Sequence, residues 1–174
     1  EVYLAVDQRL GSAVALKRCY FAGDETLGGA FEREARVLAR MRHPVLPKVS
    51  DHFSETEEQF LVMEYISGDD LAKRLESAKK PFPMQWVLYW ADELLDALSY
   101  LHTHEPPIIH RDIKPSNVMV TLYDGKPVPK VIDFGVAKAT EQKLTERTLF
   151  TQYGTMVGTL EYMSPEQAEM SAQG

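Results

Sequence analysis

The residues best suited to chemistry lie together in one short segment, IIHRDIKPSNVMV. Asp112, Lys114 and Asn117 stand there at fixed offsets, between apolar flanks at 108–109 and 118–120 that we expect to form short buried strands. The polar middle contains a proline, which favours a loop held on a rigid base. Such a loop would place a carboxylate that can accept a hydroxyl proton beside a cation, with an amide oxygen available to a metal ion.

Three further charged residues lie where they could join this loop. Lys17 closes the apolar run AVALK, and a buried lysine needs a counter-ion, which Glu34 on the next expected helix could provide. Asp133 follows the apolar residues of VIDFG, and Mg²⁺ prefers one or two carboxylates together with substrate phosphates. Each residue alone is more simply explained as a solvated side chain, an edge-strand lysine or a turn cap. Their joint occurrence in this order favours a site for a nucleotide and a metal ion.

The elements that would position these residues form a strand-rich region with one helix, followed by a mainly helical region. We expect strands at 1–7, 12–21, 48–54, 59–66 and 130–135, a loop at 23–29, helices at 30–41 and 84–102, and a turn at 123–129. An apolar stripe on the second helix is interpreted as core packing, and its members are Val87, Trp90, Ala91, Leu94, Leu95, Leu98 and Leu101. The predicted fold class is α+β, with two lobes at residues 1–66 and 67–174.

Composition limits the classes of protein to which the chain can belong. Of its 174 residues 44% are hydrophobic, which is enough for a packed core, and its net charge of −7 argues against broad nucleic-acid binding. The single cysteine, Cys19, allows no internal disulfide and suits a reducing compartment. No apolar run approaches the roughly 20 residues that span a bilayer, and the start, EVYLAVD, does not resemble a signal peptide. We therefore expect this portion to be cytoplasmic, and we interpret it as a piece of a longer chain because it opens within a strand and without Met.

Five motifs in fixed order resemble the signature set of the eukaryotic-like (Hanks-type) protein kinases. They are VALK, the helical Glu34, HRDIKPSN, DFG and GTLEYMSPE, and together they extend over nearly the whole chain. The likeness is greatest to bacterial Ser/Thr protein kinases, for which GTxxYMSPEQA is a familiar pattern. It implies a two-lobed kinase fold, ATP and Mg²⁺ as cofactors, and transfer of the ATP γ-phosphate to Ser or Thr hydroxyls of a protein substrate.

The resemblance also implies a role for each matching residue. Lys17 would hold the α- and β-phosphates and pair with Glu34; Asp112 would orient the substrate hydroxyl and accept its proton; Lys114 would steady the phosphoryl group; Asn117 and Asp133 would hold Mg²⁺. The adenine slot would be formed by Val2, Ala15, Met63 and Met119, with the backbone of Glu64 and Ile66 at the adenine edge and Asp70 reaching the ribose. His110 and Phe134 would pack with Leu38 and Val49 into a column linking the lobes.

Substrate choice and control follow from the same resemblance. Lys114 and Thr159 stand where the Ser/Thr branch of the family keeps these residue types. Ser116 replaces an acidic residue that selects basic substrates in some members, so we expect no strict demand for Arg near the acceptor. Arg111 directly before the catalytic aspartate suggests control by phosphorylation. Thr151 is the first candidate for the modified residue, followed by Thr148 and Thr155.

The chain departs from the family pattern at both ends. We expect the Gly-rich phosphate loop immediately before Glu1 and the later helices of the large lobe after Gly174. GDETLGGA is no substitute for that loop, because Gly29 stands where a phosphate-binding lysine should be. A pseudokinase or regulatory fragment that acts as a binding module remains an alternative, as does a kinase of small molecules, although the latter would not need GTLEYMSPE. A membrane anchor in the parent protein and a homodimer are both compatible with the sequence.

Overall fold

The structure, a computed structural model, describes residues 1–20, 25–56, 58–110, 112–133, 160–162 and 164–165, and within the first helix it describes the backbone but not the side chains of residues 25–27, 30 and 34. The described elements are, in chain order, β1 (Val2–Asp7), β2 (Ser12–Tyr20), α1 (Glu25–Arg40), β3 (Val49–Glu55), β4 (Glu58–Glu64), α2 (Leu71–Ala78), α3 (Met84–His102), η1 (Pro115–Asn117), β5 (Val118–Tyr123), β6 (Lys126–Val131) and η3 (Leu160–Tyr162). A sheet with one helix precedes a mainly helical part, which confirms the predicted α+β class.

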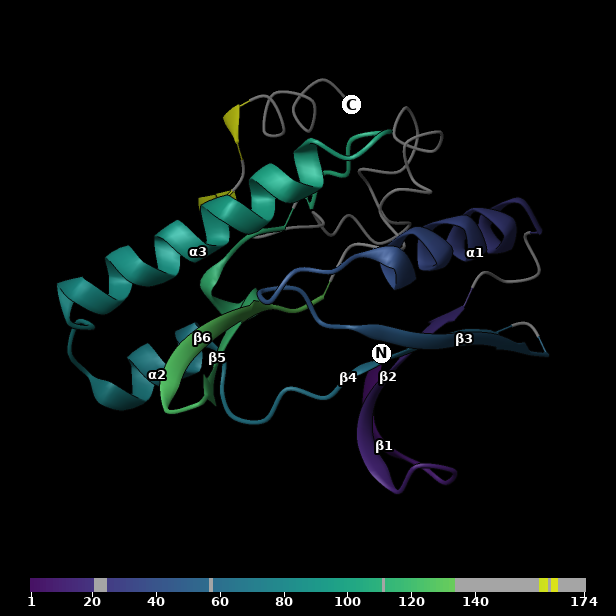
Figure 1. Cartoon of the computed structure of the whole chain (residues 1–174), viewed down its shortest axis with the longest axis horizontal. Helices are drawn as coiled ribbons and strands as arrows, with labels where there is room; N and C mark the ends of the chain where they lie inside the picture. Colours follow the sequence, from purple (N-terminus) through teal and green to yellow (C-terminus); the bar gives the residue numbers. More distant parts are fainter. Residues whose placement is uncertain (21–24, 57, 111, 134–159, 163, 166–174) are drawn as a thin grey trace.

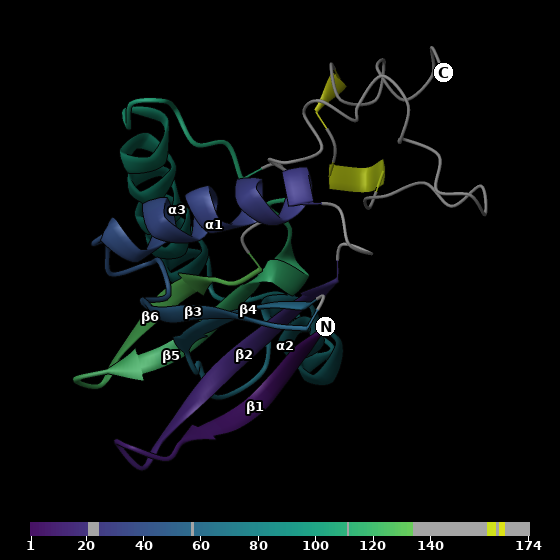
Figure 2. The same cartoon turned by 90° about the vertical axis from the view of Figure 1, so that its right-hand side faces the viewer.

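Strands β1 to β4 form one antiparallel sheet in the order β1-β2-β4-β3. Helix α1 lies across one face of this sheet (Figures 1 and 2). Phe31, Ala35 and Leu38 recur at helical spacing on α1, and all three are buried in the same core cluster as Leu61 of β4. Burial of this stripe is the main reason why the helix forms against the sheet.

Helix α1 is longer than the sequence predicts. It begins at Glu25, so most of the expected loop at 23–29 is helical, including Gly28 and Gly29. The expectation was wrong because glycine lowers helix propensity by only about 1 kcal/mol relative to alanine, and tertiary packing overrides such a preference. The packed stripe that starts at Phe31 allows the helix to extend one and a half turns towards its N-terminus.

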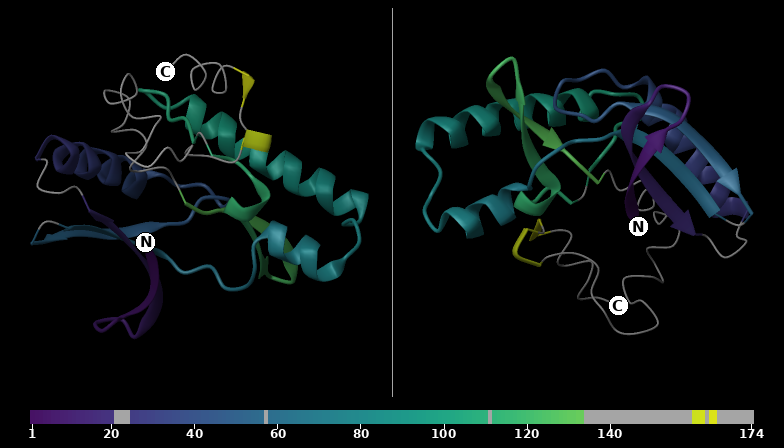
Figure 3. Two further views of the ribbon diagram at one scale, coloured as in Figure 1. Left: turned by 180° about the vertical axis from the view of Figure 1, so that it is seen from behind. Right: turned by 90° about the horizontal axis from the view of Figure 1, so that it is seen from below.

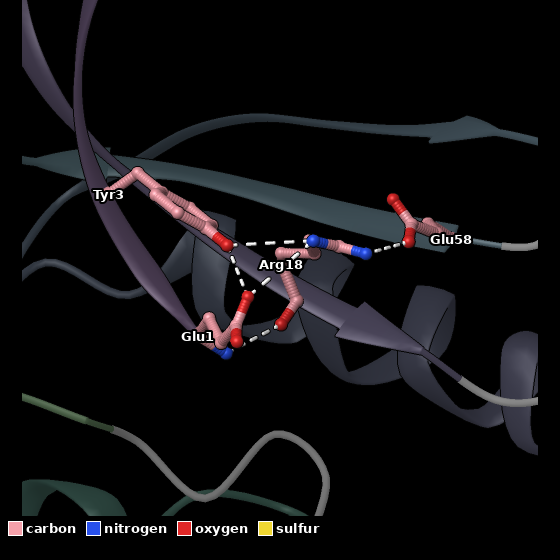
Figure 4. A network of polar contacts seen from close by, with 4 residues as sticks. All are labelled: Glu1, Tyr3, Arg18 and Glu58. Atoms are coloured by element: carbon pink, nitrogen blue, oxygen red, sulfur yellow. Dashed lines mark hydrogen bonds and ion pairs between the residues drawn. The ribbon is translucent and has the colours of Figure 1, made fainter.

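Arg18 is the centre of a polar network that joins three strands of the sheet (Figure 4). Its guanidinium bonds to Glu58 on β4, and its Nη1 lies 3.5 Å from both the Glu1 carboxylate and the Tyr3 hydroxyl. The hydrogen bond to Glu58 raises the pKa of Arg18, and the hydrogen bond that Tyr3 donates lowers the pKa of the Glu1 carboxyl. Both shifts favour the charged forms of Arg18 and Glu1, and the network ties β1 to β2 and β4.

Helix α3 spans Met84–His102, as the apolar stripe predicts. Trp90, Ala97 and Leu101 are buried, and Ala97 and Leu101 join the core cluster that also contains residues of α1 and β4. The prediction of core packing was wrong for Val87, Ala91 and Leu95, which are exposed; Leu95 keeps 65% of its surface accessible. The stripe in the sequence is wider than the face that α3 buries against the described elements.

Strands β5 and β6 form a separate antiparallel hairpin. The expected turn at 123–129 is confined to Asp124 and Gly125, whose φ angles of 49° and 75° suit a two-residue hairpin turn. The strand expected at 130–135 therefore starts at Lys126 and ends at Val131. Prolines are tolerated on edge strands, and among the described residues β6 pairs with β5 alone. The flank at 118–120 opens β5 as expected, whereas 108–109 forms no strand and Ile109 is exposed.

Helix α2 was not predicted from the sequence. The Asp70 side chain caps its first turn by accepting a hydrogen bond from the Lys73 backbone N at 3.0 Å. Lys79 ends the helix in the left-handed conformation, with φ 50°.

Helices α2 and α3 and the β5–β6 hairpin lie together at one end of the molecule, with the four-stranded sheet at the other (Figure 3).

One hydrophobic cluster links the two parts. It contains Val49 and Leu61 from the sheet, Leu101 from α3 and Val131 from β6. Val45, in the connection between α1 and β3, belongs to the same cluster, and its carbonyl accepts a hydrogen bond from the Val131 backbone N at 2.9 Å. This shared core fixes β6 beside the sheet. Among the helices of the described residues, none is long and apolar enough to cross a membrane.

Candidate active site

Asn117 fixes the position of Asp112. The short helix η1 begins at Pro115, and the Asn117 backbone N closes it on the Lys114 carbonyl at 2.9 Å. The Asn117 side chain is buried, and its Nδ2 donates to the Asp112 carbonyl at 2.8 Å and to Asp112 Oδ2 at 2.9 Å. No hydrogen bond to the amide oxygen of Asn117 occurs among the described residues. The amide is therefore oriented with its donor towards Asp112 and its oxygen available to a cation.

Lys114 engages the other oxygen of the same carboxylate. Its Nζ lies 3.3 Å from Asp112 Oδ1, and the two side chains are 19% and 14% exposed. Both oxygens of Asp112 thus have a donor, one neutral and one charged. The loop predicted at this position presents a carboxylate in one fixed orientation, with a cation beside it.

Lys17 and Asp133 form the second pair of the site. Lys17 lies on β2, opposite Val2 on one side and Leu61 on the other, and only 11% of its side chain is exposed. Its Nζ is 2.5 Å from Asp133 Oδ1, so a carboxylate compensates the cost of burying the ammonium. Asp133 has φ 61°, an uncommon backbone conformation for a residue other than glycine. The pairing expected between Lys17 and Glu34 concerns a glutamate side chain outside those described.

The end of the β5–β6 hairpin connects the two pairs. Asn117 directly precedes β5, Asp133 follows β6 by two residues, and Val118 is paired with Val131. The Asn117 carbonyl accepts a hydrogen bond from the backbone N of Ile132, at 2.9 Å. The two candidate metal ligands are thus held at neighbouring ends of one hairpin, next to the lysine of β2.

The residues expected around adenine come from both parts of the molecule. Ala15 on β2 is paired with Met63 on β4, and Ile66, just after β4, is buried. Asp70 and Met119 form an isolated bridge between the start of α2 and β5. Met63 and Glu64 also line a small cavity of about 40 Å³ together with Ile132 and Asp133. In this structure the Asp70 side chain caps α2.

Several predicted residues lie outside the described part of the chain. They are Arg111, Phe134, Thr148, Thr151, Thr155 and Thr159. Their roles remain predictions from sequence. His110, Leu38 and Val49, the other members of the expected column, are all buried.

Sequence reasoning missed the contacts that hold the connection between α1 and β3. His43 Nε2 lies 3.1 Å from Asp96 Oδ2 on α3, and the Arg42 backbone N donates to the Tyr100 hydroxyl at 3.2 Å. It also missed an ion pair between Glu64 and Lys130. No spacing rule predicts such pairs, because their partners are far apart in sequence and belong to different elements.

Comparison with known families identifies the chain. The family described as "Protein kinase domain" matches residues 1–173, so the chain belongs to the protein kinase domain family. A probable serine/threonine-protein kinase of Streptomyces coelicolor is 39% identical over 97% of this chain and 25% of the relative. A probable serine/threonine-protein kinase PknB of Lactococcus lactis is 36% identical over 98% of this chain and 26% of the relative. The chain thus spans about a quarter of the length of these curated relatives.

Among solved structures, the fold is similar to that of Rad53 1-466 in complex with AMP-PNP. The TM-score is 0.73 at 26% sequence identity, over 98% of this chain and 39% of that one. This similarity confirms the kinase fold expected from the five motifs.

Proposed function

We propose that this chain forms the nucleotide-binding and catalytic part of an ATP-dependent Ser/Thr protein kinase, which transfers the ATP γ-phosphate to hydroxyl groups of a protein substrate. One observation carries the proposal: the Asp112–Asn117 pair and the Lys17–Asp133 pair lie next to each other at the end of the β5–β6 hairpin. The hydrogen bond from the Ile132 backbone N to the Asn117 carbonyl connects them. The names of the bacterial relatives and the AMP-PNP bound to Rad53 support the same reaction.

Asp112 has the environment of a base that orients a hydroxyl group. Asn117 and Lys114 hold its two oxygens, so the carboxylate cannot rotate freely. In transfer, the substrate oxygen forms a bond to the γ-phosphorus while the bond to the β–γ bridging oxygen breaks, and the hydroxyl proton passes to Asp112. Lys114 lies close enough to Asp112 to offset negative charge on the transferred group. ADP leaves with the bridging oxygen.

The residues present fit Mg²⁺. Asp133 supplies a carboxylate and Asn117 a neutral oxygen that the structure leaves oriented away from Asp112. This donor set suits a hard cation that takes its other ligands from phosphate and water. Bound there, Mg²⁺ would neutralise phosphate charge. Lys17, which contacts Asp133 in this structure, would exchange that contact for phosphate oxygens.

The function can be tested by phosphate transfer from radiolabelled ATP to casein, measured with the whole protein that carries this chain. Asp112→Asn should lower kcat by about 10²-fold or more, which is the range for loss of a general base. Affinity for an ATP analogue should stay within about twofold of the unmodified protein, since the substitution preserves the shape of the side chain.

Asp92→Asn is the matched control, because Asp92 is exposed on α3 and carries the same change of charge. Equal transfer by Asp112→Asn and the unmodified protein would refute the proposed mechanism. A protein that binds the ATP analogue but never transfers phosphate, with Asp112 intact, would instead support the alternative of a binding module.

A further inference from the structure

We propose that Glu64 and Lys130 act as positioning residues that set the distance between the adenine edge and the metal-binding carboxylate. This inference rests on the proposed kinase function. The Lys130 Nζ lies 3.0 Å from both Oε1 and Oε2 of Glu64, so one ammonium bridges the whole carboxylate. Lys130 is mostly buried, with 13% of its side chain exposed, whereas 38% of the Glu64 side chain is exposed.

The pair joins two elements that form opposite sides of the proposed nucleotide site. Glu64 is the last residue of β4, and its backbone is the predicted partner of the adenine edge. Lys130 lies on β6, directly opposite Met119 of β5. Met119 is expected to contact one face of the adenine ring, whereas Glu64 lies at its edge. Three residues after Lys130 comes Asp133. The Glu64–Lys130 ion pair therefore connects the residue at the adenine edge with the strand that carries Lys130 opposite Met119 and that leads to the metal ligand Asp133.

The connection between α1 and β3, which ends at Lys48, also holds Glu64 in place. The Lys48 backbone N donates to Glu64 Oε2 at 3.2 Å, and the Lys48 carbonyl accepts from the Glu64 backbone N at 2.8 Å. Lys48 ends the connection that begins after α1, and this connection is fixed to β6 through Val45 and Val131. Glu64 is thus held between an anchored backbone and Lys130.

Loss of the Glu64–Lys130 pair should affect binding of the nucleotide rather than the transfer step. A nucleotide with its metal would contact the β4 end and Asp133 at the same time, so a site that no longer holds them at the right separation binds the nucleotide more weakly. The Asp112 loop is fixed by its own contacts with Asn117 and Lys114. Loss of the pair should therefore raise KM for ATP and leave kcat nearly unchanged, which a merely structural role would not produce.

The test measures KM for ATP, kcat and the unfolding midpoint of the whole protein. Lys130→Met keeps an unbranched side chain of nearly the same length without its charge, and Glu64→Gln keeps an acceptor for the Lys48 backbone N. Each should raise KM about fivefold to tenfold with kcat within about twofold, which is the pattern expected when an interaction that binds the substrate and the transition state equally is lost. The double variant should have a KM for ATP no higher than that of either single variant, since both single variants remove the same interaction.

Lys130→Arg is the conservative variant, and it should restore KM because arginine can bond a carboxylate through two nitrogens. Glu32→Gln is the matched control, since it breaks the exposed Glu32–Arg36 pair on α1. A lower unfolding midpoint with unchanged KM would overturn the inference, as would additive effects in the double variant. In either case, loss of transfer in Asp112→Asn would leave the proposed function standing. Absence of ATP binding and transfer in the unmodified protein would refute both.

Discussion

Replacement of Asn117 by alanine should damage both stability and transfer. The change removes the bond to the Asp112 carbonyl at 2.8 Å and the bond to the Asp112 carboxylate at 2.9 Å. A neutral hydrogen bond contributes about 0.5–1.5 kcal/mol and one to a charged group about 1.5–3 kcal/mol. The Asp112 side chain is 14% exposed, so little water can replace the lost donor. We therefore expect the free energy of unfolding to fall by about 2–4 kcal/mol.

The assay is urea unfolding followed by circular dichroism, with phosphate transfer measured under conditions where the variant is folded. Transfer should fall by about 10²-fold or more, because the base loses its orientation together with one metal ligand. Ser116→Ala is the control, since Ser116 is exposed on the same short helix and its replacement should change stability by less than about 0.5 kcal/mol. If Asn117→Ala unfolded at the same urea concentration as Ser116→Ala and transferred phosphate equally well, the assigned role of this amide would be wrong.

Two further substitutions and one mapping experiment test other parts of the account. Leu101→Ala should lower the free energy of unfolding by about 2–5 kcal/mol, because Leu101 is 1% exposed in the shared core; an effect below 1 kcal/mol in the same urea assay would contradict that core. Asp70→Ala should lower the free energy of unfolding by about 1 kcal/mol, because the α2 cap is lost. Amide hydrogen exchange at the first turn of α2 should become faster, and an unchanged exchange rate would refute the capping role. Phosphopeptide mapping of the active protein should find phosphate on Thr151, or next on Thr148 or Thr155, and none on these three would refute the predicted switch.

The sequence selected the candidate site residues directly, whereas it predicted the bounds of the elements around them less accurately. Asp112, Asn117 and Asp133 were selected because their residue types suit one reaction and occur in a fixed order, and this information lies in the chain itself. Their distances could not be predicted, and neither could the direct contact of Lys17 with Asp133, because such contacts depend on how β2 meets the β5–β6 hairpin.

The errors in the fold have identifiable physical causes. Two glycines suggested a loop before residue 30, yet helix α1 passes through them because its packed face outweighs their low propensity. Residues 127 and 129 are prolines and suggested a long turn, whereas a two-residue turn at Asp124 and Gly125 already reverses the chain. On α3, periodicity indicated an apolar face, but burial of Leu95 depends on neighbours that the pattern of one helix does not specify.

The account depends on Lys17, Asn117 and Asp133 acting on one nucleotide and its metal ion. Calorimetric titration of a non-hydrolysable ATP analogue, with and without Mg²⁺, tests this most directly. The unmodified protein should bind the analogue about tenfold or more tightly with Mg²⁺, and Asp133→Asn should remove most of that difference while it retains the metal-free affinity. An Asp133→Asn variant with the full Mg²⁺ effect would contradict the account.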